Sequence, residues 1–217
     1  MMSVLVYTES WNGNFRKSTY EAVSYASKVA KSLNTEVIAI ALGNETDDEL
    51  KKLGKYGASK VLSANHIEKA DNKAATKVIA NNIGNTNIIV FASTYTSRMI
   101  APRLSVQIKA GIASNVIELP YSSSPIKIKR KAFSSKAIED AIINTEKAII
   151  ILSPNAFGLL ESNIDCEIQK IESNNSTDFH IKGQEIISGK ISLTEAETIV
   201  SAGRGLKGPE NWNIIED

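Results

Sequence analysis

A glycine-rich string near the end of the chain contains the residue types best suited to binding chemistry. Its sequence is SAGRGLKGPENW, and it places Gly203, Gly205 and Gly208 around Arg204. Glycines let backbone amides approach a ligand closely, and the planar guanidinium of Arg204 can lie against a phosphate or an aromatic ring. Pro209 suits the first turn of a helix, whose amino end favours an anion. The string therefore indicates either an ordinary turn or an anion or nucleotide site, with Arg204, Gly203 and Gly205 as candidate binding residues.

Other reactive side chains are sparse. Cys166 is the single cysteine, which excludes an internal disulfide and disfavours a metal site built from clustered thiolates. It lies in the strictly alternating run Ile164–Lys170, which predicts a half-exposed edge strand with Cys166 turned inward as a small core side chain rather than a nucleophile. His66 and His180 stand in polar stretches far from any cysteine or hydroxyl motif, and we interpret both as solvated or structural. We therefore predict no catalytic residues and no metal ligands.

A second polar region follows the buried-strand pattern Ile88–Ala92. The segment Ser93–Ser97 supplies hydroxyls, and Pro102 suits the first turn of a helix that follows them. If Ile88–Ala92 belongs to a parallel sheet, these hydroxyls lie at its carboxyl edge, where ligand or partner contacts are expected. Arg98 and Arg103 would serve an anion, a partner protein or only solvent, and the sequence leaves these three alternatives open.

The elements that must position these residues alternate between strand and helix patterns over the first 118 residues. Ser18 and Glu21 fit a capping box at the start of the first helix, and Gly54 is expected to end the second. Such alternation implies parallel strands joined by right-handed crossovers, a doubly wound α/β sheet of the Rossmann-like or adenine-nucleotide-hydrolase-like kind. Strands are predicted at Ser3–Thr8, Glu36–Leu42, Lys60–Ser63 and Ile88–Ala92, and helices at about 18–32, Thr46–Leu53 and Asn72–Ile83.

Beyond residue 115 the pattern changes toward antiparallel structure. Apolar and basic residues alternate from Ile126 to Arg130, and Ala148–Leu152 is a strongly apolar strand. Lys136–Asn144 has helix-like spacing but no good cap. Because strands flank it on both sides, we interpret it as a strand of an antiparallel meander added to the parallel sheet.

The chain divides into three predicted parts. Residues 1–171 form the amino-terminal α/β domain. Residues 172–197, which open on the polar sequence ESNNSTD, form a linker and connecting segment. Residues 198–217 begin a second domain, with a short strand at Thr198–Ser201 before the glycine-rich string.

Composition and motifs exclude several classes of function. The net charge is +1, with 25 basic and 24 acidic residues well mixed, so neither a nucleic-acid footprint nor an anionic membrane surface is indicated. No apolar run approaches the roughly 20 residues that cross a bilayer, and no signal-peptide core is present, so a cytoplasmic protein without direct membrane insertion is expected. The first turn has no G-x-G-x-x-G, and no Walker motif occurs, which disfavours a standard dinucleotide or P-loop site.

The string SAGRGLKGPENW resembles the start of the flavin-binding domain in the alpha subunit of electron transfer flavoproteins. The upstream pieces VLVYTE, GASKVL, TYTSRMIAPRL and KAFSSKA agree in order, so the resemblance covers essentially the whole chain. Ala202 replaces the first glycine of the usual pair and Trp212 replaces a phenylalanine. Ser97 and Met99 stand where glycine and an acidic residue are common.

The resemblance implies an electron carrier rather than a substrate-converting enzyme. Arg204 matches the arginine of the motif that contacts FAD in the family. The whole protein would carry electrons on FAD from dehydrogenases, such as acyl-CoA dehydrogenases, to a quinone-linked or other oxidoreductase. The amino-terminal domain would dock the beta subunit and help frame the flavin. The chain would be a fragment that does not hold FAD on its own.

Two other functions remain open from the sequence. The first is a stand-alone nucleotide-binding α/β domain of the stress-protein or ATP-pyrophosphatase type. It needs a glycine-rich phosphate loop after the first or fourth strand, and TYTSRM contains no glycine. The second is a purely structural module that docks a homologous α/β partner through the apolar strands beyond Asn115.

Overall fold

The computed structural model describes residues 3–64, 67–68, 70–173, 182–183, 193, 196 and 198–216. The chain forms two compact units, Met1–Lys182 and Gly183–Asp217, and we describe each by itself. His66 and His180, and most of the predicted linker, lie outside the described residues. In the part of the chain that is described, no helix has the length and apolar character needed to cross a membrane.

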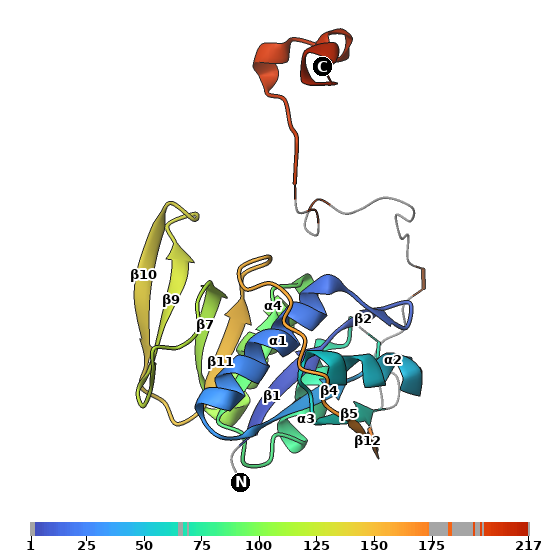
Figure 1. Cartoon of the computed structure of the whole chain (residues 1–217), viewed down its shortest axis with the longest axis vertical. Helices are drawn as coiled ribbons and strands as arrows, with labels where there is room; N and C mark the ends of the chain where they lie inside the picture. Colours follow the sequence, from blue (N-terminus) through green and yellow to red (C-terminus); the bar gives the residue numbers. More distant parts are fainter. Residues whose placement is uncertain are drawn as a thin grey trace. The chain divides into compact units, whose positions relative to one another are not determined.

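A large sheet dominates the first unit (Figure 1). The pairs that join its main strands are all parallel. These strands are β1 (Ser3–Thr8), β4 (Glu36–Ala41), β5 (Lys60–Ala64), β6 (Ile88–Ala92), β7 (Gly111–Val116), β11 (Ala148–Leu152) and β12 (Glu167–Ile171). An antiparallel extension consists of β8 (Ser122–Ser123), β9 (Ile126–Ala132) and β10 (Ala137–Ile143). Within the described residues the strand order is β10-β9-β7-β11-β6-β1-β4-β5-β12, and β8 pairs with β9.

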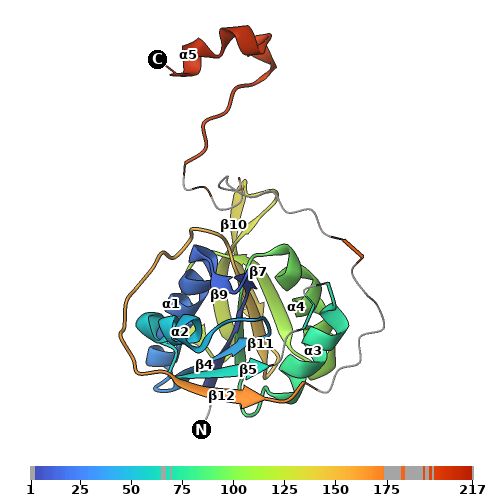
Figure 2. The same ribbon diagram turned by 90° about the vertical axis from the view of Figure 1, so that its right-hand side faces the viewer.

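Helices cover both faces of the sheet (Figure 2). One face carries α1 (Lys17–Ser32) and α2 (Asp47–Lys51), the latter continued by the 3-10 helix η1 (Lys52–Tyr56). The other face carries α3 (Asn72–Asn81) and α4 (Tyr95–Ile108). A small separate hairpin consists of β2 (Ser10–Trp11) and β3 (Asn14–Phe15). The predicted doubly wound, mostly parallel α/β fold with an antiparallel addition is confirmed.

The central strands are buried on both faces because their side chains alternate between two cores. In β1, Val4 and Val6 point into the cluster that contains the α1 side chains, whereas Leu5 and Tyr7 point into the cluster that contains the α3 and α4 side chains. Each fully buried aliphatic side chain contributes about 1.5–3 kcal/mol. This two-sided burial explains why the strands appear in the sequence as uninterrupted apolar runs.

The predicted capping box at Ser18 and Glu21 is wrong. The α1 helix begins at Lys17 after Arg16, and no side chain caps that end. The side chain of Glu21 is instead 2% exposed and accepts hydrogen bonds from backbone amides far along the chain. The second helix does begin as predicted, because Thr46 caps α2 by accepting from the Glu49 amide.

The helix after β6 begins earlier than predicted. Thr94 is its N-cap and accepts from the Ser97 amide at 3.0 Å, so the predicted loop Ser93–Ser97 is largely the first turn of α4. Pro102 lies inside the helix rather than in its first turn. The helix continues through Pro102 because a proline removes only one backbone donor, and buried Ile100 and Leu104 hold both sides of it against the core.

The antiparallel part also differs from the prediction. The strand predicted at Lys136–Asn144 is confirmed as β10, which pairs antiparallel with β9. Strand β11, however, does not close a meander: it pairs in parallel with both β6 and β7. The sequence AIIIL is buried along its whole length, as a strand covered on both faces requires. Strand β7, which sequence reasoning missed, carries only three apolar residues among six.

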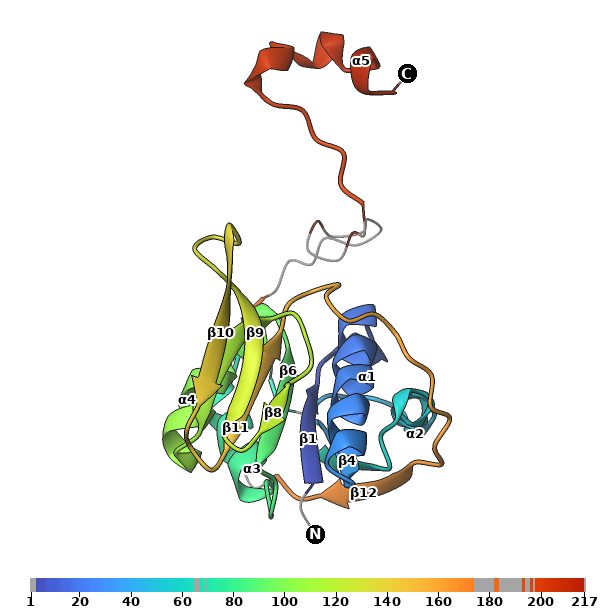
Figure 3. The ribbon, with the colours of Figure 1, turned by 60° about the vertical axis from the view of Figure 1, so that its left-hand side comes forward.

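A strap, residues 153–166, connects β11 to the far edge of the sheet (Figure 3). It crosses α1 and η1, where the Ser162 and Ile164 amides donate to the carbonyls of Lys55 and Gly54 at 2.7 and 2.9 Å. The strap ends in β12, which pairs in parallel with β5 at the sheet edge. The predicted edge strand is therefore confirmed, although it begins at Glu167 rather than Ile164.

Cys166 lies at the end of the strap, 8% exposed, in the core cluster that contains α1. Burial, and then the charges of Asp165 and Glu167, raise the pKa of its thiol to about 11. The thiolate is the reactive form, so at pH 8 the folded chain should react with a thiol reagent about 100-fold more slowly than the unfolded chain. Labelling kinetics with and without denaturant measure this ratio. Equal rates would show that Cys166 is an accessible thiol.

The second unit contains only short helical turns in its described residues. These are the 3-10 helices η2 (Arg204–Leu206) and η3 (Pro209–Asn211), and α5 (Asn213–Glu216). The strand predicted at Thr198–Ser201 is wrong, because these residues have no strand conformation. An isolated extended segment needs a neighbouring strand for its amides, and the described part of this unit offers none. Pro209 does open a helical turn, as predicted, but a 3-10 turn.

Candidate functional site

The glycine-rich string folds into a hollow of about 510 Å³ within the second unit. Its lining combines apolar surface with two cationic side chains. The lining residues are Ala202, Gly203, Arg204, Leu206, Lys207, Gly208, Pro209 and Trp212. None of these eight residues is acidic. The hollow therefore offers apolar surface and two positive charges, with the Glu210 carboxylate next to Gly208.

Two tight turns shape the hollow. The first is η2, in which the Leu206 and Lys207 amides donate to the carbonyls of Gly203 and Arg204. The second is centred on Lys207, where the Gly208 amide donates to the Leu206 carbonyl at 2.9 Å and Lys207 adopts φ 66°. This is a γ-turn of the rare, strained kind, which a residue with a side chain seldom adopts. Local strain of this type is often found at ligand sites.

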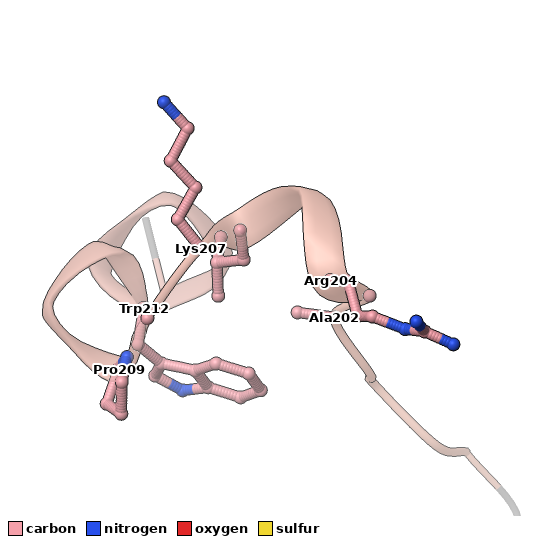
Figure 4. Close-up of a pocket in the computed structure, with 8 residues that line it drawn as sticks. Ala202, Arg204, Lys207, Pro209 and Trp212 are labelled. Atoms are coloured by element: carbon pink, nitrogen blue, oxygen red, sulfur yellow. The ribbon is translucent and has the colours of Figure 1, made fainter.

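The side chains lie on different sides of the hollow (Figure 4). The Trp212 indole lies on its inner side near Pro209, whereas the Arg204 and Lys207 side chains extend outward from the rim. The Asn211 amide group donates to the Leu206 carbonyl at 2.9 Å and joins η3 to η2. The apolar wall is thus internal, and the two cationic side chains lie at the rim and point away from it.

Two of the three predicted site residues line the hollow. Gly203 and Arg204 line the hollow, whereas Gly205 does not. A Cβ atom added to either Gly203 or Gly205 would meet nothing within 4 Å, so the backbone is open to a ligand there. Sequence reasoning did not single out Lys207, which lines the hollow and has φ 66°. In the sequence, Trp212 stands out only as a departure from phenylalanine.

The other predicted location is the carboxyl edge of β6, where the polar side chains bond to other groups of the protein. Arg98 donates from Nε and Nη2 to the Ser93 hydroxyl at 3.3 and 3.1 Å, while Arg103 is exposed on α4. The Thr94 and Thr96 hydroxyls bind a carboxylate of the protein itself. These polar side chains at the edge therefore already have hydrogen-bond partners within the protein.

The hollow has the features that part of a flavin dinucleotide requires. The indole of Trp212 and the Leu206 side chain offer apolar surface for a planar ring, and Arg204 and Lys207 offer positive charge for a pyrophosphate. The open backbone at Gly203 allows close approach. The residues present thus fit a portion of such a ligand.

Comparisons with known proteins identify the family of the chain. Residues 4–175 match the electron transfer flavoprotein domain. The chain is 27% identical over 229 residues to an electron transfer flavoprotein subunit alpha of Syntrophomonas wolfei, covering 100% of this chain and 69% of that protein. It is 25% identical to the Bacillus subtilis subunit alpha, covering 99% of this chain and 68% of the relative.

A further relative is a subunit of an enzyme. It is subunit LctC of the lactate dehydrogenase (NAD(+),ferredoxin) of Acetobacterium woodii, 24% identical over 99% of this chain and 54% of its own length. The family match covers most of the first unit, and the matches to the alpha-type relatives extend through the glycine-rich string. The chain therefore belongs to the electron transfer flavoprotein family, as an alpha-type member.

Proposed function

We propose that this chain belongs to an electron-carrying subunit and that its residues 198–216 hold part of an FAD. The observation that carries the proposal is the hollow, whose lining combines Arg204 and Lys207 at the rim with the apolar surface of Leu206 and Trp212. The alpha-type relatives, of which the match covers 69% and 68%, support the same assignment.

Each of these groups has a distinct task in holding the cofactor. Arg204 presents a planar fork of donors suited to phosphate oxygens, and its positive charge also favours added negative charge on the ligand. Lys207 supplies a second, flexible charge. Trp212 offers a ring face for stacking, and Gly203 keeps the backbone open. The FAD, when bound, accepts and releases the electrons, and the protein contributes binding, charge and exclusion of water.

The first unit serves as the scaffold and docking surface in this proposal. An alpha-type subunit implies a beta-type partner, and the α/β unit would dock that chain while residues 172–197 connect it to the cofactor segment. Dehydrogenases, such as acyl-CoA dehydrogenases, would donate the electrons, and a quinone-linked or other oxidoreductase would accept them. The protein would act as a carrier in the cytoplasm rather than convert a substrate itself.

Replacing Arg204 by alanine tests the cofactor assignment. The full reading frame is expressed with its beta-type subunit, and FAD retention is followed by absorbance and by the dissociation constant. Loss of charge-assisted hydrogen bonds should weaken FAD binding by about 10- to 50-fold. The dissociation constant of Arg204→Lys should lie between those of the wild type and Arg204→Ala, because lysine keeps the positive charge but lacks the planar fork of donors.

Arg103→Ala is the matched control, since Arg103 is an exposed arginine of α4 outside the hollow. It should leave FAD binding unchanged. A complex that is colourless with wild-type protein, or one in which Arg204→Ala and Arg103→Ala bind FAD equally well, would contradict the assignment.

A further inference from the structure

The switch point of the main sheet lies between β1 and β6. Strand β1 pairs with β4 on one side and with β6 on the other, so the chain winds outward in both directions from this pair. Open α/β sheets bind ligands in the crevice beyond the carboxyl ends of such strands. In this protein the residues that follow β1 and β6 are Glu9 and the segment Ser93–Ser97. A nucleotide phosphate would be expected at this place.

A carboxylate of the protein already occupies that position. Glu9 follows β1 directly and is 5% exposed. One of its carboxylate oxygens accepts from the Thr94 hydroxyl at 2.5 Å, and the other accepts from the Thr96 hydroxyl at 3.0 Å. The Thr19 hydroxyl, from α1, binds the Glu9 carbonyl at 2.7 Å. Elements from both faces of the sheet thus hold Glu9 in place.

The location of this carboxylate matters because Thr94 and Thr96 lie at the start of α4. The Thr94 hydroxyl accepts from the Ser97 amide while it donates to Glu9, so the helix cap and the carboxylate form one network. The amino end of a helix carries partial positive charge and attracts anions. Here the anion at the helix end is the Glu9 side chain, so the protein itself supplies the negative charge.

A second carboxylate adds to the negative charge near the end of β1. Glu45 follows β4 and accepts from the Gly43 amide at 3.2 Å. Burial, followed by the charges of Glu9 and Glu45, raises the pKa of Tyr7 far above its usual range. Both carboxylates therefore act on the same strand end. A phosphate approaching it would meet like charge in place of open amides.

We propose that Glu9 is a built-in anion at the amino end of α4, which takes the place of a nucleotide phosphate and keeps the first unit free of nucleotide. Glu9 is thus the residue that determines specificity against nucleotides at this switch point. The inference concerns the first unit alone, and it involves neither the flavin nor a second subunit.

Anion rescue of Glu9→Ala in the full 217-residue chain tests this proposal. Removal of the carboxylate should destabilise the protein and leave a space that inorganic phosphate can enter. At roughly ten times its dissociation constant, phosphate should then raise the unfolding midpoint of Glu9→Ala by about 3 to 5 °C relative to chloride at equal ionic strength. Wild-type protein should show no such rise, and calorimetric titration with AMP or ATP should detect no saturable binding.

Two variants serve as controls. Glu146→Ala removes an exposed carboxylate and should behave like wild type. Glu9→Gln fills the space without charge, so it should be destabilised but insensitive to phosphate. If Glu9→Ala does not fold in chloride, its refolding yield in phosphate is compared with that in chloride, and phosphate should restore it. Saturable AMP or ATP binding by wild type, or an equal phosphate response in Glu9→Ala and Glu146→Ala, would overturn the proposal.

Discussion

Glu21→Ala is expected to lower the free energy of unfolding of the first unit by about 3 to 4 kcal/mol. The Glu21 carboxylate accepts from the backbone amides of Asn155, Phe157 and Gly158 at 3.0, 2.8 and 3.0 Å. Alanine would leave three strap amides without their acceptor. Each hydrogen bond to a charged group contributes about 1.5–3 kcal/mol, but water can reach the partly exposed strap and offset part of this loss. Urea unfolding followed by circular dichroism measures the change.

Hydrogen exchange distinguishes this mechanism from a general loss of stability. The amides of Phe157 and Gly158 should lose protection in Glu21→Ala before those of the central strands do, because they lose their direct partner. Lys28→Ala, on the exposed side of the same helix, should change the unfolding free energy by less than about 0.5 kcal/mol. If Glu21→Ala were as stable as Lys28→Ala, the carboxylate would not hold the strap.

Glu21 also shows where sequence reasoning fails. The local pattern Ser18-x-x-Glu21 matches a capping box, and nothing nearby in the sequence argues against it. The amides that bind Glu21 lie more than 130 residues further along the chain. A partner at that separation is fixed by the fold and leaves no local signal. The same holds for β11, whose apolar run predicts burial but not the neighbours between which it inserts.

What could be predicted was local in origin. Apolar runs predict the strands β1, β4 and β6, and apolar residues at helical spacing predict α1. In the candidate site, Gly203 and Arg204 were identified from a short string of residue types. The strained turn at Lys207 could not be, because a positive φ at a lysine is set by the two flanking turns rather than by the residue itself.

Gly54→Ala is the second large effect and is expected to cost about 3 kcal/mol. The sequence suggested that Gly54 ends a helix, but Gly57 does so, with φ 110°. Gly54 lies within η1, and a Cβ there would be 2.4 Å from the Ile164 carbonyl oxygen and 2.9 Å from the Cys166 Cβ. Both are atoms of the strap, and the first belongs to the backbone, which cannot move aside as a flexible side chain does. Urea unfolding gives the change in stability.

Gly84→Ala is the matched control, because it separates backbone strain from loss of space. Gly84 has φ 52° and nothing within 4 Å of an added Cβ, so alanine there should cost only about 1 to 2 kcal/mol. Only Gly54→Ala should also expose Cys166, since it forces the strap from η1, and labelling of the thiol should become faster in native buffer. Unchanged labelling together with wild-type stability in Gly54→Ala would show that the strap does not need this close approach. Gly54 is thus required because it leaves room for the strap, and not because of its backbone conformation. This close approach accounts for both the path of the strap and the burial of Cys166.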